Sequence, residues 1–98
     1  MTTTLKTLHL SIRGRVQGVG YRASLQQVAQ AHGLRGWVRN RADGQVEALL
    51  HGPADAVDAA LAWAQRGPPL ARVVAVETTA LTTAPADLPP DFAWRPTA

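Results

Sequence analysis

Cysteine is absent from this sequence, lysine occurs once, and aromatic side chains are few. Without cysteine the chain has no disulfide, thiolate nucleophile, zinc–thiolate site or iron–sulfur cluster. Long apolar runs are also missing, since nowhere do about 18 apolar residues follow one another as a membrane-spanning helix requires. Residues 1–6 lack the apolar stretch of a signal peptide. These absences predict a cytoplasmic protein that does not enter the membrane.

What the sequence does contain is typical of a folded globular domain. Hydrophobic residues make up 46% of it and charged residues 17%, a balance that distinguishes it from disordered chains. Its 98 residues match the length of one domain and leave no room for a second catalytic domain. We therefore predict a single domain over residues 1–98.

Positive charge is carried almost entirely by arginine, which accounts for all but one of the 10 basic residues. The formal net charge is +3. The arginine side chain binds two oxygens of a phosphate or carboxylate at once, so an anionic ligand is expected. Nucleic acid is not expected, because no basic run interleaves with the aromatic residues as a base-stacking surface requires.

The apolar periodicity predicts an α+β fold. The expected elements are strands at 8–13, 34–41, 45–51 and 71–79, helices at 21–32 and 53–66, and a short last strand at 92–95. Asp43-Gly44 marks the turn of a hairpin between the second and third strands. The order β-α-β-β-α-β is that of a ferredoxin-like sandwich, an antiparallel sheet with two helices on one face.

This connectivity has a consequence for function. The first and second strands are joined through a helix and therefore run parallel, so the segment 14–20 and Asn40 are expected at the same end of the sheet. Arg22 lies in the first turn of the predicted helix, directly after that segment. We therefore expect Arg22 and Asn40 to meet.

The segment between the first strand and helix has the composition of a phosphate-binding loop. Glycines permit positive φ and leave backbone N–H groups accessible, so the loop can fold around an anion. The amides at the start of the helix point to the same place, and Arg22 adds a charged group there.

A Walker A motif is excluded because no Gly-Lys-Ser/Thr follows. A dinucleotide-binding motif is disfavoured, since Asn40 stands where an acidic residue would bind the ribose. A tight turn whose glycines only allow close packing remains the alternative.

Two longer motifs resemble those of the acylphosphatase family. Gly14-Arg15-Val16-Gln17-Gly18-Val19-Gly20-Tyr21-Arg22 is similar to the family's first motif, with tyrosine where phenylalanine is more usual. The segment 36–47, Gly-Trp-Val-Arg-Asn-Arg-Ala-Asp-Gly-Gln-Val-Glu, is similar to the second. The resemblance extends over about residues 5–95, the expected core of the domain. The tail departs from the family pattern, because Arg95 is followed by Pro96-Thr97-Ala98 instead of an aromatic residue. This departure concerns contacts made by the tail and leaves the two motifs unaffected.

The resemblance implies a metal-independent enzyme that hydrolyses acyl phosphates to a carboxylate and inorganic phosphate. It implies that the phosphoryl group is bound by the loop, and that Arg22 and Asn40 are the catalytic residues, with Asn40 orienting the attacking water. The implied phosphate-binding loop comprises Arg15, Val16, Gln17, Gly18, Val19, Gly20, Tyr21 and Arg22. Inorganic phosphate is then both product and inhibitor. No cofactor is expected, and the enzyme is expected to act as a monomer. The alternative function is a phosphate- or acyl-phosphate-binding module without turnover.

The other polar residues favour structural roles. The histidines at positions 9, 32 and 51 fall on separate elements without metal-ligand spacing, so no metal site is predicted. Asp43 is expected to stabilise the hairpin turn, and Glu47 to face an arginine across the hairpin. For Tyr21 and Trp37 we expect packing rather than a place in the site.

Overall fold

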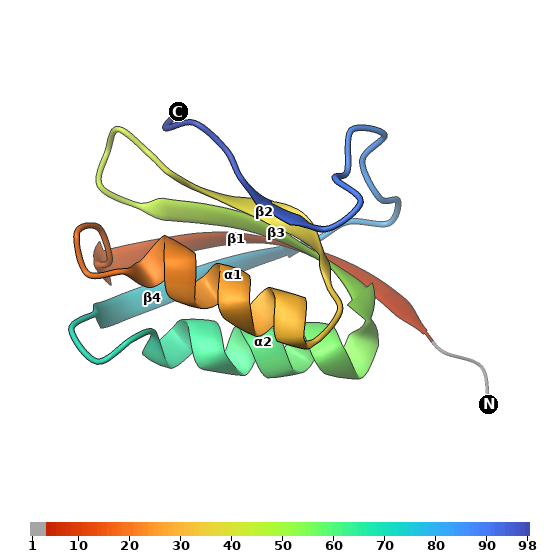
Figure 1. Ribbon diagram of the computed structural model, residues 1–98, viewed down its shortest axis with the longest axis horizontal. Coiled ribbons are helices and arrows are strands. Elements are labelled where there is room, and N and C mark those ends of the chain that lie inside the picture. Colours follow the sequence, from red (N-terminus) through yellow and green to blue (C-terminus); the bar gives the residue numbers. More distant parts are fainter. Residues whose placement is uncertain (1–3) are drawn as a thin grey trace.

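The order of elements in the structure is the one that the apolar periodicity predicts (Figure 1). The computed structural model describes residues 4–98. The expectation that residues 1–6 are not a signal peptide falls partly on Met1–Thr3, which lie outside the described residues. The elements of the structure are β1 (Leu5–Arg15), α1 (Tyr21–Ala31), β2 (Arg35–Asn40), β3 (Val46–Pro53), α2 (Ala54–Arg66), β4 (Arg72–Ala80) and β5 (Phe92–Trp94). No helix among residues 4–98 is both long and apolar enough to traverse a bilayer.

The strands form one sheet in the order β4-β1-β3-β2-β5. β1 pairs antiparallel with β3 and β4, and β2 pairs antiparallel with β3, as predicted. The sheet is not wholly antiparallel, because β5 pairs parallel with β2. The reason is the path of residues 81–91, which leave the end of β4 and reach the opposite edge of the sheet at the end where β2 begins (Figure 1). The ferredoxin-like fold is otherwise confirmed.

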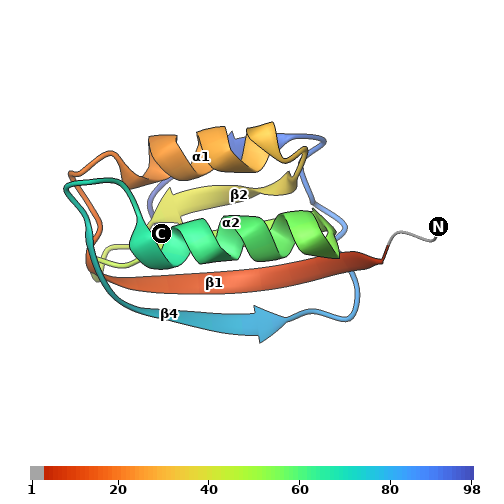
Figure 2. The same ribbon diagram turned by 90° about the horizontal axis from the view of Figure 1, so that it is seen from below.

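Both helices lie on one face of the sheet, where they bury the apolar side of each strand (Figure 2). Along β1 the core residues are Leu8, Leu10 and Ile12, at every second position. From the helices, Leu25 and Val57 are completely buried against the sheet. The alternation of apolar and polar residues that predicted the strands therefore places apolar side chains in this core and the intervening side chains on the opposite, helix-free face.

The strand register brings the glycine-rich segment and Asn40 to the same end of the sheet. Ile12 near the end of β1 and Asn40 at the end of β2 are both aligned with Val46, the first residue of β3. β1 and β2 thus run in the same direction on either side of β3. The segment 16–20 begins from this end, so the predicted proximity to Asn40 is confirmed.

Candidate active site

Two glycines determine the shape of the loop that follows β1. Gly18 and Gly20 have φ angles of 74° and 80°, in the left-handed region that favours glycine. A Cβ atom added at either position would meet no heavy atom within 4 Å. Close packing is therefore not what requires these two glycines, and that alternative interpretation is wrong for them. Their role is to turn the backbone while leaving its surface open.

The open surface presents backbone N–H groups. In the part of the chain that the structure describes, the amides of residues 17–20 donate no hydrogen bond to the protein. Helix α1 then begins without a side-chain cap and without an acidic residue in its first turn. Its first amides are free, and the positive end of its dipole faces the loop. Such an arrangement attracts an anion.

Arg22 adds a full positive charge to this end of α1. Its guanidinium lies over the ring of Trp94 on β5, with Cζ 4.4 Å from the ring centroid. None of the ion pairs found among residues 4–98 involves Arg22. The charge of this guanidinium is therefore not neutralised by a carboxylate and remains available to an anionic ligand.

Asn40 lies in the same pocket as Arg22. The pocket is lined by Val16, Gln17, Gly18, Gly20, Tyr21, Arg22, Ala23, Asn40 and Trp94. The Asn40 side-chain oxygen Oδ1 is buried and is, among the described residues, the one buried side-chain nitrogen or oxygen without a hydrogen-bond partner. Leaving such an acceptor unpaired costs about 1–3 kcal/mol. An unpaired acceptor beside an anion-binding loop is suited to receive a hydrogen bond from a bound molecule.

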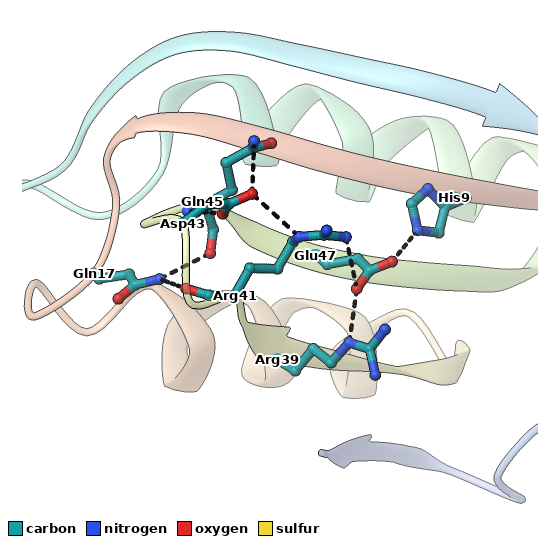
Figure 3. A network of polar contacts seen from close by, with 7 residues as sticks. All are labelled: His9, Gln17, Arg39, Arg41, Asp43, Gln45 and Glu47. Carbon is teal, nitrogen blue, oxygen red and sulfur yellow. Dashed lines mark hydrogen bonds and ion pairs between the residues drawn. The ribbon is translucent and has the colours of Figure 1, made fainter. Parts of the chain in front are cut away.

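The side chain of Gln17 connects the loop to the strand that carries Asn40. Its Nε2 donates to the carbonyl oxygen of Arg41 at 2.8 Å and to that of Gln45 at 2.9 Å (Figure 3). Arg41 N also donates to Gln45 O at 2.8 Å, which closes the hairpin. Gln17 thereby fixes the loop relative to the residue that follows Asn40. The sequence assigned Gln17 to the loop but contained no signal for this side-chain role.

A buried carboxylate stabilises the same hairpin from the helix-free face (Figure 3). Glu47 Oε1 accepts from Arg39 Nε at 2.6 Å, and Oε2 bonds His9 Nε2 at 2.5 Å. The predicted arginine partner of Glu47 is thus confirmed. Burial by itself raises the pKa of Glu47, but the hydrogen bonds and charges of Arg39 and His9 outweigh it, so this pKa lies below its usual value. Asp43 Oδ1 accepts from Gln45 N at 3.0 Å, the turn role that was expected.

We predict that Glu47→Gln lowers the free energy of unfolding by about 1–3 kcal/mol at pH 7. A carboxyl group whose pKa is lowered by folding stabilises the protein above its unfolded pKa, about 4.3, and this contribution is lost as the pH falls through the folded pKa. The difference between wild type and variant should therefore shrink between pH 7 and pH 3 in urea unfolding. The control is Glu77→Gln, because Glu77 is 69% exposed and pairs with Arg13 at 3.5 Å. If the stability difference between wild type and Glu47→Gln were the same at pH 3 as at pH 7, it would contradict the assignment of a negatively charged Glu47 in the folded protein.

The remaining predicted loop residues occupy different places. Arg15 is exposed and is aligned with Arg72 on β4, outside the pocket lining. Val19 also lies outside the lining and packs against the core. The Tyr21 side chain is buried, and its hydroxyl donates to Ala64 O at 2.7 Å. Burial raises the pKa of Tyr21. The expected packing of this side chain is therefore confirmed, and its ring attaches the start of α1 to α2, but Tyr21 also belongs to the pocket lining, which was not expected.

Trp37 packs on the helix-free face rather than in the pocket. The guanidinium carbons of Arg39 and Arg95 each lie 4.9 Å from its ring centroid, and His9 makes an edge contact with it. His51 bonds Thr7 through Nδ1 at 2.8 Å. Among residues 4–98, no three histidine or carboxylate side chains are grouped so as to hold a metal ion.

The tail reaches the site through its backbone. Ala98 N donates to Asn40 O at 3.1 Å, and Ala42 N donates to Ala98 O at 2.7 Å. Arg95 N bonds Val38 O at 3.0 Å, so the segment after β5 continues alongside β2. These contacts need no aromatic side chain. The departure of Pro96–Ala98 from the family pattern therefore leaves a backbone contact beside Asn40 in place.

Comparison with known proteins gives a consistent result. The Acylphosphatase family model matches residues 8–93. The acylphosphatase of Azoarcus sp. (strain BH72) is 63% identical over 75 residues, 76% of either chain. Acylphosphatase 2 of Ralstonia nicotianae is 52% identical over 97 residues, 99% of either chain. The crystal structure of acylphosphatase from Bacillus subtilis matches with a TM-score of 0.86 at 33% identity, covering 94% of this chain and 99% of that chain. The resemblance of the two motifs is confirmed, and the chain belongs to the acylphosphatase family.

Proposed function

We propose that this acylphosphatase hydrolyses the bond between phosphorus and the acyl oxygen of small acyl phosphates without a metal ion. The water oxygen bonds to phosphorus, and the bond to the acyl oxygen breaks, with its electron pair leaving on the carboxylate. One water proton moves to a phosphoryl oxygen, so that the products are a carboxylate and dihydrogen phosphate. The observation that carries the proposal is that one pocket brings together Arg22, the glycine-rich loop and Asn40, whose buried Oδ1 has no hydrogen-bond partner among residues 4–98.

The leaving group explains why so few side chains are needed. A carboxylate is a weak base at neutral pH, because carboxylic acids have pKa values near 4. It departs without being protonated, so a general acid is not required. Among residues 4–98, no aspartate, glutamate, histidine or lysine lines the pocket. The proposal therefore assigns the water proton to the phosphoryl group itself.

The loop amides and Arg22 would bind the phosphoryl oxygens. In phosphoryl transfer, negative charge is spread over the three equatorial oxygens, and catalysis depends mainly on positioning and on stabilising that charge. Free N–H groups fixed by Gly18 and Gly20 supply fixed donors that need no reorganisation during the reaction. Arg22, which has no ion-pair partner among residues 4–98, supplies two donors and a positive charge.

Asn40 would orient the water. An amide oxygen accepts a hydrogen bond from a water O–H and directs the oxygen lone pair of that water towards phosphorus. The contacts of Gln17 and of Ala98 next to Asn40 hold the end of β2 in place relative to the loop. The geometry thus supports positioning of the water rather than removal of its proton.

The proposal predicts turnover of benzoyl phosphate that is unchanged by EDTA and competitively inhibited by inorganic phosphate. Phosphate has the shape and charge of the group that the loop is proposed to bind, so it should raise KM and leave kcat unchanged. The measurement is the initial rate over a grid of substrate and phosphate concentrations, with and without EDTA.

A phosphate-binding module without turnover would bind phosphate in calorimetry but show no hydrolysis. Loss of activity in EDTA with recovery in Mg²⁺ would contradict the metal-independent step. Inhibition that leaves KM unchanged would place the substrate outside the loop.

The oligomeric state and the cellular compartment of the enzyme follow from the same site and substrate. Arg22 and Asn40 meet within a single copy of the chain, so the proposed site needs no residue from a second copy, and we propose that the enzyme acts as a monomer. A phosphorylated substrate is charged and does not cross a lipid bilayer readily. We therefore propose that the enzyme works in the compartment where its substrate forms, the cytoplasm.

A further inference from the structure

Trp94 is brought into the pocket by the alternation of the last strand. Phe92 on β5 is buried in the core, and side chains two positions apart in a strand point to the same face. Trp94 therefore also faces the helix side, where it is aligned with Val38 of β2. At this position it lies beyond the core and beneath Arg22, at the beginning of α1. The ring thus forms part of the pocket that contains Arg22 and Asn40.

The ring is unusually exposed for a residue on the helix side of the sheet. Trp94 is 46% exposed and is one of four large hydrophobic residues that the described chain exposes, with Leu5, Leu70 and Val74. Of these four, Trp94 alone lines the pocket. Exposed apolar surface next to a polar site marks a place where a ligand is contacted.

The position of the ring is fixed before any ligand binds. β5 pairs with β2 in the sheet, and two further backbone hydrogen bonds flank this pairing, from Gly36 N to Asp91 O at 3.1 Å and from Arg95 N to Val38 O at 3.0 Å. The guanidinium of Arg22 packs on the ring at 4.4 Å. A side chain held in this way loses little freedom when it contacts a ligand, so the contact contributes more to binding.

The phosphoryl end is identical in all acyl phosphates, so it cannot distinguish among them. Discrimination has to come from residues around the acyl group. Apart from Trp94, the described pocket lining consists of glycines, small aliphatic residues, polar side chains and the buried Tyr21. An aromatic acyl group that extends from the phosphoryl site towards solvent can therefore find a ring to stack against only at Trp94.

We propose that Trp94 is a specificity-determining residue that contacts the acyl group and makes the enzyme favour aromatic acyl phosphates over acetyl phosphate. This inference rests on the function proposed above. It differs from a role in positioning Arg22, because a positioning role would affect every acyl phosphate equally.

The test compares kcat/KM for benzoyl phosphate with kcat/KM for acetyl phosphate. In Trp94→Ala we expect the benzoyl-to-acetyl ratio to fall about 5–10-fold, as expected for a lost aromatic contact. If the substitution also disturbs Arg22, it changes kcat/KM by the same factor for both substrates, because both carry the same phosphoryl group. The ratio of the two kcat/KM values is therefore unaffected by that disturbance. Trp94→Phe retains a ring and should keep the ratio within about twofold of wild type.

Leu70→Ala is the matched control, since Leu70 is 73% exposed and lies outside the pocket lining. It should leave the ratio unchanged. Equal losses for both substrates in Trp94→Ala, or no loss for either, would overturn the specificity role while the proposed hydrolysis stands. A wild-type enzyme that hydrolyses neither substrate would overturn the proposed function and, with it, this inference.

Discussion

Arg22→Ala should lower kcat/KM for benzoyl phosphate by about 10³-fold or more, the magnitude associated with an arginine that stabilises a transferring phosphoryl group. The guanidinium is proposed to bind the phosphoryl oxygens both in the bound substrate and in the transition state. Its loss should therefore raise KM and lower kcat together. Inhibition by inorganic phosphate should weaken in the same variant. Steady-state kinetics with and without phosphate measure all three effects.

Arg22→Lys separates charge from geometry. Lysine retains the positive charge but not the two parallel donors, so we expect it to recover little of the lost activity. The matched control is Arg13→Ala, because Arg13 is half-exposed on β1 and pairs with Glu77 away from the pocket. Near-normal kinetics in Arg22→Lys would show that charge alone is sufficient, which contradicts the proposed bidentate contact.

Asn40→Ala should lower kcat by about 10²–10³-fold while phosphate affinity stays within about threefold of wild type. The reason is that Asn40 is proposed to orient water and not to bind the phosphoryl group. Because its Oδ1 makes no hydrogen bond within the described protein, the substitution breaks no bond at that atom. The thermal midpoint should therefore not fall, and loss of an unpaired buried acceptor should raise it. All three quantities can be measured on one preparation.

The values of kcat, phosphate affinity and thermal midpoint together decide between a catalytic and a structural role for Asn40. A folded variant that binds phosphate and hardly turns over supports the water-orienting role. A less stable variant with normal kcat would make Asn40 a structural residue at the end of β2 and contradict that role. Asn40→Asp offers a second comparison, since it keeps the shape of the side chain but places a negative charge beside the phosphoryl group. It should weaken phosphate inhibition, which Asn40→Ala should not.

The sequence predicts the meeting of the loop and Asn40 because connectivity determines strand direction. A helix between two strands of one sheet makes them parallel, and this brings the end of β1 and the end of β2 together whatever their side chains are. The chemistry of Gly18, Gly20 and Arg22 is likewise local, since backbone conformation and charge belong to the residues themselves.

Other parts of the site depend on distances that no local pattern encodes. The place of Trp94 follows from the parallel pairing of β5 with β2 after the irregular segment 81–91. The side-chain role of Gln17 depends on the approach of Arg41 O, and the contact of Glu47 with His9 depends on the register between β1 and β3. Each requires the assembled sheet, so it is visible only in the structure.

The interior position of β1, between β4 and β3, also affects the biosynthesis of the protein. Its partner β3 lies in the middle of the chain and its partner β4 near the end, and pairing Leu8 with Ala80 closes a loop of about 70 residues. At roughly 5–20 residues per second, a ribosome needs about 3–13 s to extend the chain from the end of β1 to the end of β4. During that interval Leu8, Leu10 and Ile12 have been made but lack part of the sheet that will bury them. The nascent chain therefore depends on folding soon after synthesis to cover its first strand.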